Sequence, residues 1–171
     1  MAAAPALAVT VGLLALTSCG SDGADESKPL SEGGRLTIGD TVETETGTVT
    51  IRSYEVLQTA EDDEVQPPDG RSFAVVDMEG CVDSGRGGVV TIYSEDVHLQ
   101  LTDGTLLAFT RSAKEPALQP TTSVRAGNCA RGFLTFAVPR DSQAERVIYE
   151  VIPRAEVAEE QGLVTLSWTI P

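Results

Sequence analysis

Histidine and methionine are nearly absent from this chain of 171 residues, which holds one His and two Met. Copper carriers bind their metal through clusters of Met and His, so the composition excludes a copper site of that kind. No GxSxG sequence is present, which excludes the nucleophile turn of the α/β-hydrolases. No nucleophilic triad other than one around the single histidine is left to consider.

Ser94, Asp96 and His98 follow one another at every second position, a spacing that suggests a catalytic triad. In a strand, such neighbours stand about 6.6–7 Å apart, whereas a working Ser–His contact needs about 2.6–3.2 Å. Val97, Leu99 and Leu101 form the apolar side of the same stretch. We therefore interpret the Ser94 side as the solvent-facing one and expect no enzyme.

Basic residues are also scarce, with 12 Lys and Arg against 26 Asp and Glu and a formal net charge of −14. No basic stripe can neutralise phosphates, which argues against nucleic-acid binding. An acidic surface repels anionic lipid headgroups, so attachment to a membrane needs a covalent or inserted anchor. Hydrophobic residues at 41% and charged residues at 22% are typical of a folded domain.

The apolar run at residues 7–16 has signal-peptide length and is too short for a comfortable transmembrane span. It ends in Leu16-Thr17-Ser18-Cys19, which resembles the bacterial lipobox. The resemblance implies a lipoprotein signal peptide at residues 1–18, cleavage before Cys19 and a diacylglycerol thioether on its thiol, often with a further acyl chain such as palmitate on the new amine. We therefore expect a lipid anchor through Cys19 at the outer, extracytoplasmic face of the cell membrane. An uncleaved anchor and a plain secretory signal remain alternatives, and because the first basic residue is Lys28, a basic n-region is expected upstream of Met1.

Residues 19–35 are expected to form the lipidated cysteine and a flexible acidic linker. Gly, Ser, Asp and Glu dominate residues 20–35, and almost nothing there can be buried. A Gly-rich coil of this length spans roughly 20–24 Å root-mean-square, so the following domain would float just above the headgroups.

If Cys19 carries lipid, Cys81 and Cys129 remain of the three cysteines. In an exported chain, a lone pair most simply forms one disulfide. The chain-entropy model gives a bridge that closes a loop of about 49 residues a stabilisation of roughly 4 kcal/mol. A metal or redox pair is the competing interpretation, but no second cysteine lies close to either one, as a CxxC site would need.

From residue 36 to 171 the sequence has the period of two that is typical of strands, with frequent turns. We expect about eight strands, including a phase shift near Arg52-Ser53 that indicates a bulge. Asp103-Gly104 predicts the turn of a hairpin between residues 97–101 and 105–109. Trp168 shares one face of the last strand with Val164, Leu166 and Ile170, so we expect it in the core. The best helical stretch is Ala155–Gln161.

Four segments recur in order: Gly39-Asp40-Thr41-Val42, residues 70–78 (GRSFAVVDM), residues 97–104 (VHLQLTDG) and residues 125–139 (RAGNCARGFLTFAVP). Together they resemble the telokin-like, immunoglobulin-fold domain of many Gram-positive and actinobacterial lipoproteins, a domain of uncharacterised function. The resemblance implies an all-β, immunoglobulin-like β-sandwich over residues 36–171. The family usually has an Asn-containing turn after the Phe73 strand, where this chain has Gly80-Cys81-Val82-Asp83, so the resemblance casts Cys81–Cys129 as a subfamily staple between two strands.

Glu61-Asp62-Asp63-Glu64 is a carboxylate cluster in a loop before Pro67-Pro68 and a candidate metal site. Calcium prefers oxygen ligands, but the spacing does not match the EF-hand loop, and four adjacent acids are more often a solvated loop tip. Gly85-Arg86-Gly87-Gly88 places no P-loop lysine and reads as a strand connector. We expect no cofactor.

The sequence favours a non-catalytic binding or interaction module on the cell surface, with an envelope protein or cell-wall component as partner. Residues 61–69 and 84–88 are the candidate contact loops. A calcium- or other cation-binding sensor or scavenger that uses Glu61, Asp62, Asp63 and Glu64 is the alternative.

Overall fold

The computed structural model describes residues 36–57, 65–85, 87–110, 112–151 and 164–171. These residues form short and long strands and one 3-10 helix: β1 (Leu36–Thr37), β2 (Thr41–Thr44), β3 (Gly47–Leu57), β4 (Arg71–Val82), β5 (Val89–Tyr93), η1 (Ser94–Asp96), β6 (Val97–Leu101), β7 (Leu106–Ala108), β8 (Thr121–Arg125), β9 (Cys129–Pro139), β10 (Ala144–Val151) and β11 (Val164–Thr169). Within these residues, no helix is long and apolar enough to cross a membrane.

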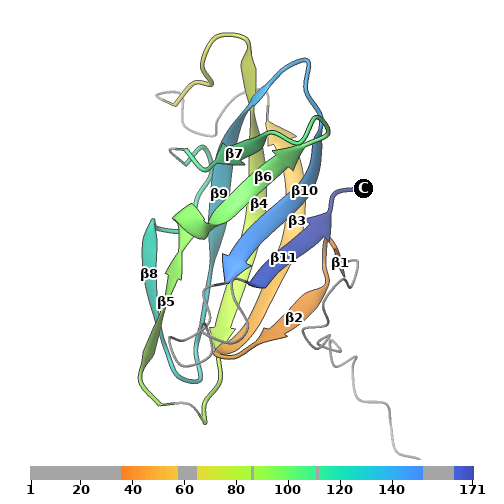
Figure 1. Cartoon of the computed structure of the whole chain (residues 1–171). Coiled ribbons are helices and arrows are strands. Elements are labelled where there is room, and N and C mark those ends of the chain that lie inside the picture. Colours follow the sequence, from red (N-terminus) through yellow and green to blue (C-terminus); the bar gives the residue numbers. More distant parts are fainter. Residues whose placement is uncertain (1–35, 58–64, 86, 111, 152–163) are drawn as a thin grey trace, which may run out of the picture.

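The strands form two main sheets and a separate ribbon (Figure 1). Sheet A has the order β2-β3-β4-β9, sheet B has the order β1-β11-β10-β6-β7, and β5 pairs with β8 alone. All pairings are antiparallel except the short parallel contact of β1 with β11. Sheet B lies in front of sheet A in Figure 1, so the described part of the chain is an all-β sandwich, as the sequence predicts.

The core lies between the two sheets and draws on strands of both. Trp168 from β11, Phe136 from β9 and Ile51 from β3 are fully buried there. The indole Nε1 of Trp168 donates a hydrogen bond to the backbone oxygen of Asp40 at 3.0 Å, which satisfies its one polar atom. The expected position of Trp168 in the core is confirmed.

Two local predictions from the sequence are also confirmed. The register between β3 and β4 shifts between Ile51 and Ser53, at the expected bulge. β6 and β7 form the expected hairpin, in which Gly104 has a φ of +87° and Thr105 N–H donates to the Asp103 side chain at 2.9 Å. A glycine at the turn allows this left-handed conformation without steric cost.

The described residues form eleven strands where the sequence suggested about eight. β1 and β2 are too short for a pattern of alternation to show, and they form through pairing with β11 and β3. The helical stretch expected at Ala155–Gln161 lies outside the described residues, as do the predicted signal peptide at 1–18 and the linker at 19–35.

The central strand β4 is buried on both faces over much of its length. Its inner face contributes Ala74, Val76 and Met78 to the core, while Phe73 and Val75 on the outer face are also buried. The crossing segment, residues 110 and 112–120 before β8, lies outside sheet A. It bridges to β9 at two places, Thr110–Thr135 and Ala117–Phe133. Ala113 of this segment packs with Phe73 in a second small core cluster.

Candidate functional site

Ser94 does not lie on a solvent-facing side of a strand, and that prediction from the sequence is wrong. Residues Ser94–Asp96 form η1, which breaks the alternation and turns Ser94 inward, so its side chain is fully buried. Its hydroxyl donates to the backbone oxygen of Gln119 at 2.8 Å, and its N–H donates to the oxygen of Pro120 at 3.0 Å. Ser94 therefore fastens η1 to the start of β8. Nδ1 of His98 is buried and has no hydrogen-bond partner in the described structure.

The outer face of sheet A carries paired charges beyond the covered part of β4. Asp77 accepts two hydrogen bonds from Arg131, from Nε at 3.0 Å and from a terminal nitrogen at 2.6 Å. Beside them, Arg52 donates to Glu79 at 2.5 Å. The hydrogen bond from each arginine to its carboxylate raises the pKa of that arginine.

Lys114 extends the charged face toward the other end of β3. Its ammonium group forms an ion pair with Glu55 and lies 4.7 Å from the ring centroid of Phe133. This contact ties the crossing segment to sheet A, because Glu55 belongs to β3 and Phe133 to β9. The charged groups of this face are thus engaged with one another.

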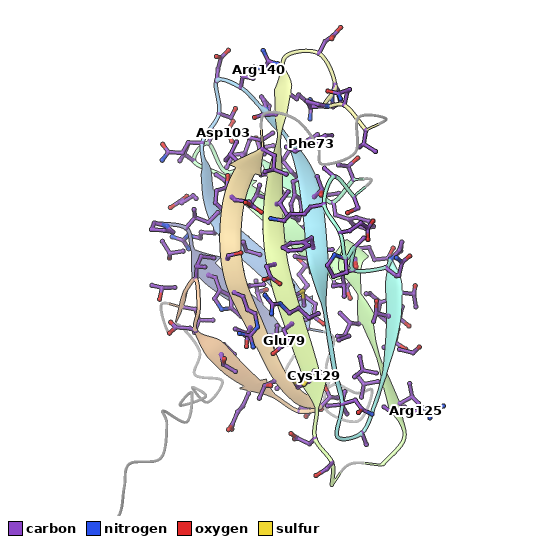
Figure 2. All side chains as sticks on the ribbon, turned by 180° about the vertical axis from the view of Figure 1, so that it is seen from behind. Phe73, Glu79, Asp103, Arg125, Cys129 and Arg140 are labelled. Carbon is purple, nitrogen blue, oxygen red and sulfur yellow. A yellow bond between two sulfur atoms is a disulfide. The ribbon has the colours of Figure 1, made fainter. Side chains whose placement is uncertain are left out.

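Cys81 and Cys129 stand directly opposite each other on β4 and β9, and a disulfide with an S–S distance of 2.07 Å joins them. Their Cα atoms lie 4.0 Å apart. Glu79 is close to both sulfurs, but sulfurs in a disulfide offer no thiolate to a metal. Figure 2 shows Glu79 and Cys129 near each other toward the lower end of this face. The pair is a staple between neighbouring strands.

A partly open cavity of about 180 Å³ lies between β3 and β4 of sheet A, β5, and the ends of β10 and β11 that meet at Val151 and Val164. Its wall is mostly apolar, and β5, β10 and the β2–β3 turn all contribute to it. The lining includes Val49, Val82, Val90, Ile92, Val151 and Val164, with Thr44, Thr46, Thr48, Thr91, Tyr93 and Tyr149 as polar members. A cavity lined in this way can bind a small apolar group that makes a few polar contacts.

Among the described residues, the charged side chains that line this cavity are all acidic: Glu45, Asp96 and Glu150. Burial raises the pKa of Asp96, and the nearby charges of Glu95 and Glu150 raise it further. Burial also raises the pKa of Tyr149 to about 12, with a smaller contribution from the charge of Asp96. The acidic residues at the cavity mouth therefore favour a positively charged ligand.

Gly80 explains why β5 can approach sheet A at this place. A Cβ built on Gly80 would lie 2.5 Å from Cδ1 of Ile92, so the missing side chain makes room for the isoleucine of β5. A glycine inside a strand is the sequence signal of such a close approach. Sequence reasoning did not identify the cavity, because its walls come from strands that are distant in the chain.

A wider and more open hollow lies at the other end of the sandwich, with a volume of about 520 Å³. Tyr54, Val56, Arg140 and Ile170 are among its lining residues. Burial raises the pKa of Tyr54, and Val56 is 50% exposed at the rim. This hollow mixes polar and apolar groups and has a single charged lining residue among the described ones.

Several residues singled out in the sequence lie outside the described residues. They are Cys19, the carboxylate cluster Glu61, Asp62, Asp63 and Glu64, and Arg86 of the β4–β5 connection. Gly87 and Gly88 of that connection have φ values of +62° and +91°. The cation-binding alternative rests on residues 61–64 and therefore stays a prediction.

No family model and no curated protein matches the sequence. Among solved structures, the chain is similar to yjhA of Bacillus subtilis, with a TM-score of 0.59 and 11% identity over 80% of this chain and 99% of that one. It is also similar to the secreted protein MPT63 of Mycobacterium tuberculosis, with a TM-score of 0.51 and 12% identity over 85% of this chain and 99% of that one.

A candidate lipoprotein of Bacillus subtilis, ycdA, has a TM-score of 0.53 and 18% identity over 75% of this chain. This chain spans 38% of the length of ycdA. At these identities the likeness shows the fold alone. The described residues therefore form a β-sandwich similar to those of these bacterial proteins.

Proposed function

We propose that this chain is a lipid-anchored extracytoplasmic protein whose telokin-like, immunoglobulin-like domain binds a partner and catalyses no reaction. The observation that carries the proposal is the Cys81–Cys129 disulfide. Disulfides persist in oxidising compartments, which favours an exported chain. Of the three cysteines, only Cys19 then remains, and it stands at the end of the lipobox-like segment.

The binding part of the proposal draws on where the charged groups lie. In the described structure, the ion pairs of Asp77, Glu79 and Glu55 occupy an open sheet face. Ser94, the serine of the triad that the sequence suggested, donates its hydroxyl hydrogen bond to the backbone oxygen of Gln119. The partly open cavity is lined by acidic and apolar groups instead, an arrangement suited to recognition.

The anchor is tested by metabolic labelling with an alkyne fatty acid, in wild type and in Cys19→Ala. Labelled wild type and unlabelled Cys19→Ala are expected, with Cys81→Ser/Cys129→Ser retaining the label as the control. Maleimide capture of a free thiol at Cys19 in the mature native protein would overturn the anchor.

Partner binding is tested by cross-linking the full chain in envelope preparations and identifying the joined peptides by mass spectrometry. One partner whose cross-links gather on one face is the expected result. Cross-links spread over all faces, with no partner enriched over Cys19→Ala, would overturn the binding role.

A further inference from the structure

Among the described strands, β5 pairs with β8 alone and through one of its two edges. It runs beside β8 in a register from Val89–Arg125 to Tyr93–Thr121. The hydrogen bonds at the two ends of this ladder are Ala126 N–H to Gly88 O and Ser94 N–H to Pro120 O. Hydrogen-bonded pairs alternate in an antiparallel ladder, so the even-numbered residues of β5 bond to β8.

The backbone groups of Val89, Thr91 and Tyr93 therefore point to the other edge. In the part of the chain that the structure describes, no strand pairs with that edge and no backbone hydrogen bond reaches it. Folded proteins usually protect such an edge with charge or proline. This one carries neither, and Val89 and Tyr93 are 58% and 43% exposed.

β10 also has an open position facing this region. Ile170 N–H donates to Glu145 O, so the odd-numbered residues of β10 bond to β11 and the even-numbered ones point toward β6. The pairing of β10 with β6 ends at Tyr149–Val97, because the chain before β6 turns into η1. The N–H and C=O of Glu150 are thus without a strand partner among the described residues.

The cavity of about 180 Å³ joins the two open edges, since β5 and the end of β10 both line it. On a strand added beside β5, every second side chain would share the face of Val90 and Ile92, which looks toward Gly80 of β4. The cavity volume is close to that of cavities of about 150 Å³ that hold one benzene molecule. One large apolar side chain therefore fits.

The charge around the cavity selects the occupant. Glu45, Asp96 and Glu150 line the cavity, and it has no basic residue among its described lining. A second copy of this chain would bring another formal charge of −14 to an acidic mouth, which disfavours self-association there. A basic segment gains from the same field.

We infer that the open edge of β5 accepts an extended, positively charged peptide segment of a partner protein. The segment pairs with the backbone of Val89, Thr91 and Tyr93 and inserts one large apolar side chain into the cavity. This inference rests on the proposed binding function and gives its partner a chemical class.

The probe is a fluorescein-labelled peptide of alternating lysine and valine with one central phenylalanine, titrated into the purified full chain in mild detergent. Saturable binding that weakens with salt is expected, because the lysines meet carboxylates. The same peptide with alternate backbone nitrogens methylated cannot pair and is expected to bind at least tenfold more weakly. A peptide with glutamate in place of lysine is expected not to bind.

Thr91→Pro removes an N–H of the open edge and leaves the β8 ladder intact, so it is expected to lower the affinity at least tenfold. Ser123→Pro is the matched control, because Ser123 stands opposite Thr91 and its N–H points away from β5. It is expected to bind within twofold of wild type. Equal binding by the two variants, or by the methylated peptide and its parent, overturns the inference.

Hydrogen exchange on wild type gives a second readout that does not depend on the folding of Thr91→Pro. Slower exchange at Thr91 and Tyr93 when the peptide is bound supports pairing, and unchanged exchange overturns it. Protection of these amides in a dimer without peptide assigns the edge to a second copy and also overturns it. Partner cross-links confined to a face without β5 overturn this inference while leaving the proposed binding function in place.

Discussion

Asp77 of β4 and Arg131 of β9 form a bidentate ion pair. Two hydrogen bonds join the buried carboxylate of Asp77 to the half-exposed guanidinium group of Arg131. Asp77 is only 4% exposed, so its charge depends on this partner for compensation. Paired geometry of this kind is among the stronger polar interactions in proteins. The pair ties together the same two strands that the disulfide joins.

Arg131→Ala is expected to lower the melting temperature clearly, because it leaves the buried carboxylate of Asp77 without its partner. Arg125→Ala removes an exposed arginine of β8 and is the control, with a melting temperature close to that of wild type. Differential scanning calorimetry measures both. Equal melting temperatures for the two variants would show that the Asp77 pair contributes little to stability.

Gly132→Ala is expected to cost about 2 kcal/mol or more of unfolding free energy. A Cβ there would lie 2.5 Å from the backbone nitrogen of Leu118, which is held by its hydrogen bond to Phe133 O and cannot easily withdraw. Gly80→Ala meets only the flexible end of Ile92 at the same distance, so a cost below about 1 kcal/mol is expected. Urea denaturation compares them, and a larger cost at Gly80 would contradict a rigid contact between the crossing segment and β9.

Loss of the disulfide in Cys81→Ser/Cys129→Ser is expected to lower the unfolding free energy by about 4 kcal/mol. The two cysteines are 48 residues apart, so the bridge removes much freedom from the unfolded chain. Denaturation with and without a reducing agent measures the effect. A reducing agent should shift the wild-type curve toward the variant and leave the variant unchanged; a further shift in the variant would point to another cause.

Alkaline stability is expected to depend on Tyr149. Its pKa is raised to about 12 in the folded protein, whereas the unfolded chain releases this proton near pH 10. The neutral form is therefore favoured on folding, and wild type loses up to about 3 kcal/mol as the pH rises from 10 to 12. Tyr149→Phe lacks this contribution, so its stability should fall less over the same range.

The alkaline experiment needs Tyr93→Phe as its control, since Tyr93 lies at the same cavity with a 43% exposed side chain. This variant should keep the wild-type dependence on pH. A Tyr149→Phe curve that runs parallel to wild type between pH 10 and 12 would rule out burial of Tyr149 as the cause.

Local patterns in the sequence predicted the features that local interactions determine. Alternation identified β11, the phase shift located the bulge after Ile51, and Asp103-Gly104 located the hairpin. The position of Trp168 followed from the same alternation. Each of these depends on neighbours within a few residues.

Features that depend on distant segments could not be read in this way. Ser94 is buried because η1 meets the start of β8 at Pro120, a contact between segments that no periodicity links. The burial of Val75 requires the crossing segment outside sheet A. The open edge of β5 results from its pairing with β8 rather than β10, which depends on tertiary packing.

β1 lies at one border of sheet B, and β2 lies at one border of sheet A, whereas the β5–β8 ribbon is found across the molecule next to β9 (Figure 1). A tether that joins the domain at Leu36 would therefore attach to the flank opposite the ribbon. A domain anchored to the membrane in this way would present the ribbon on its distal side, where it is accessible to components of the cell wall.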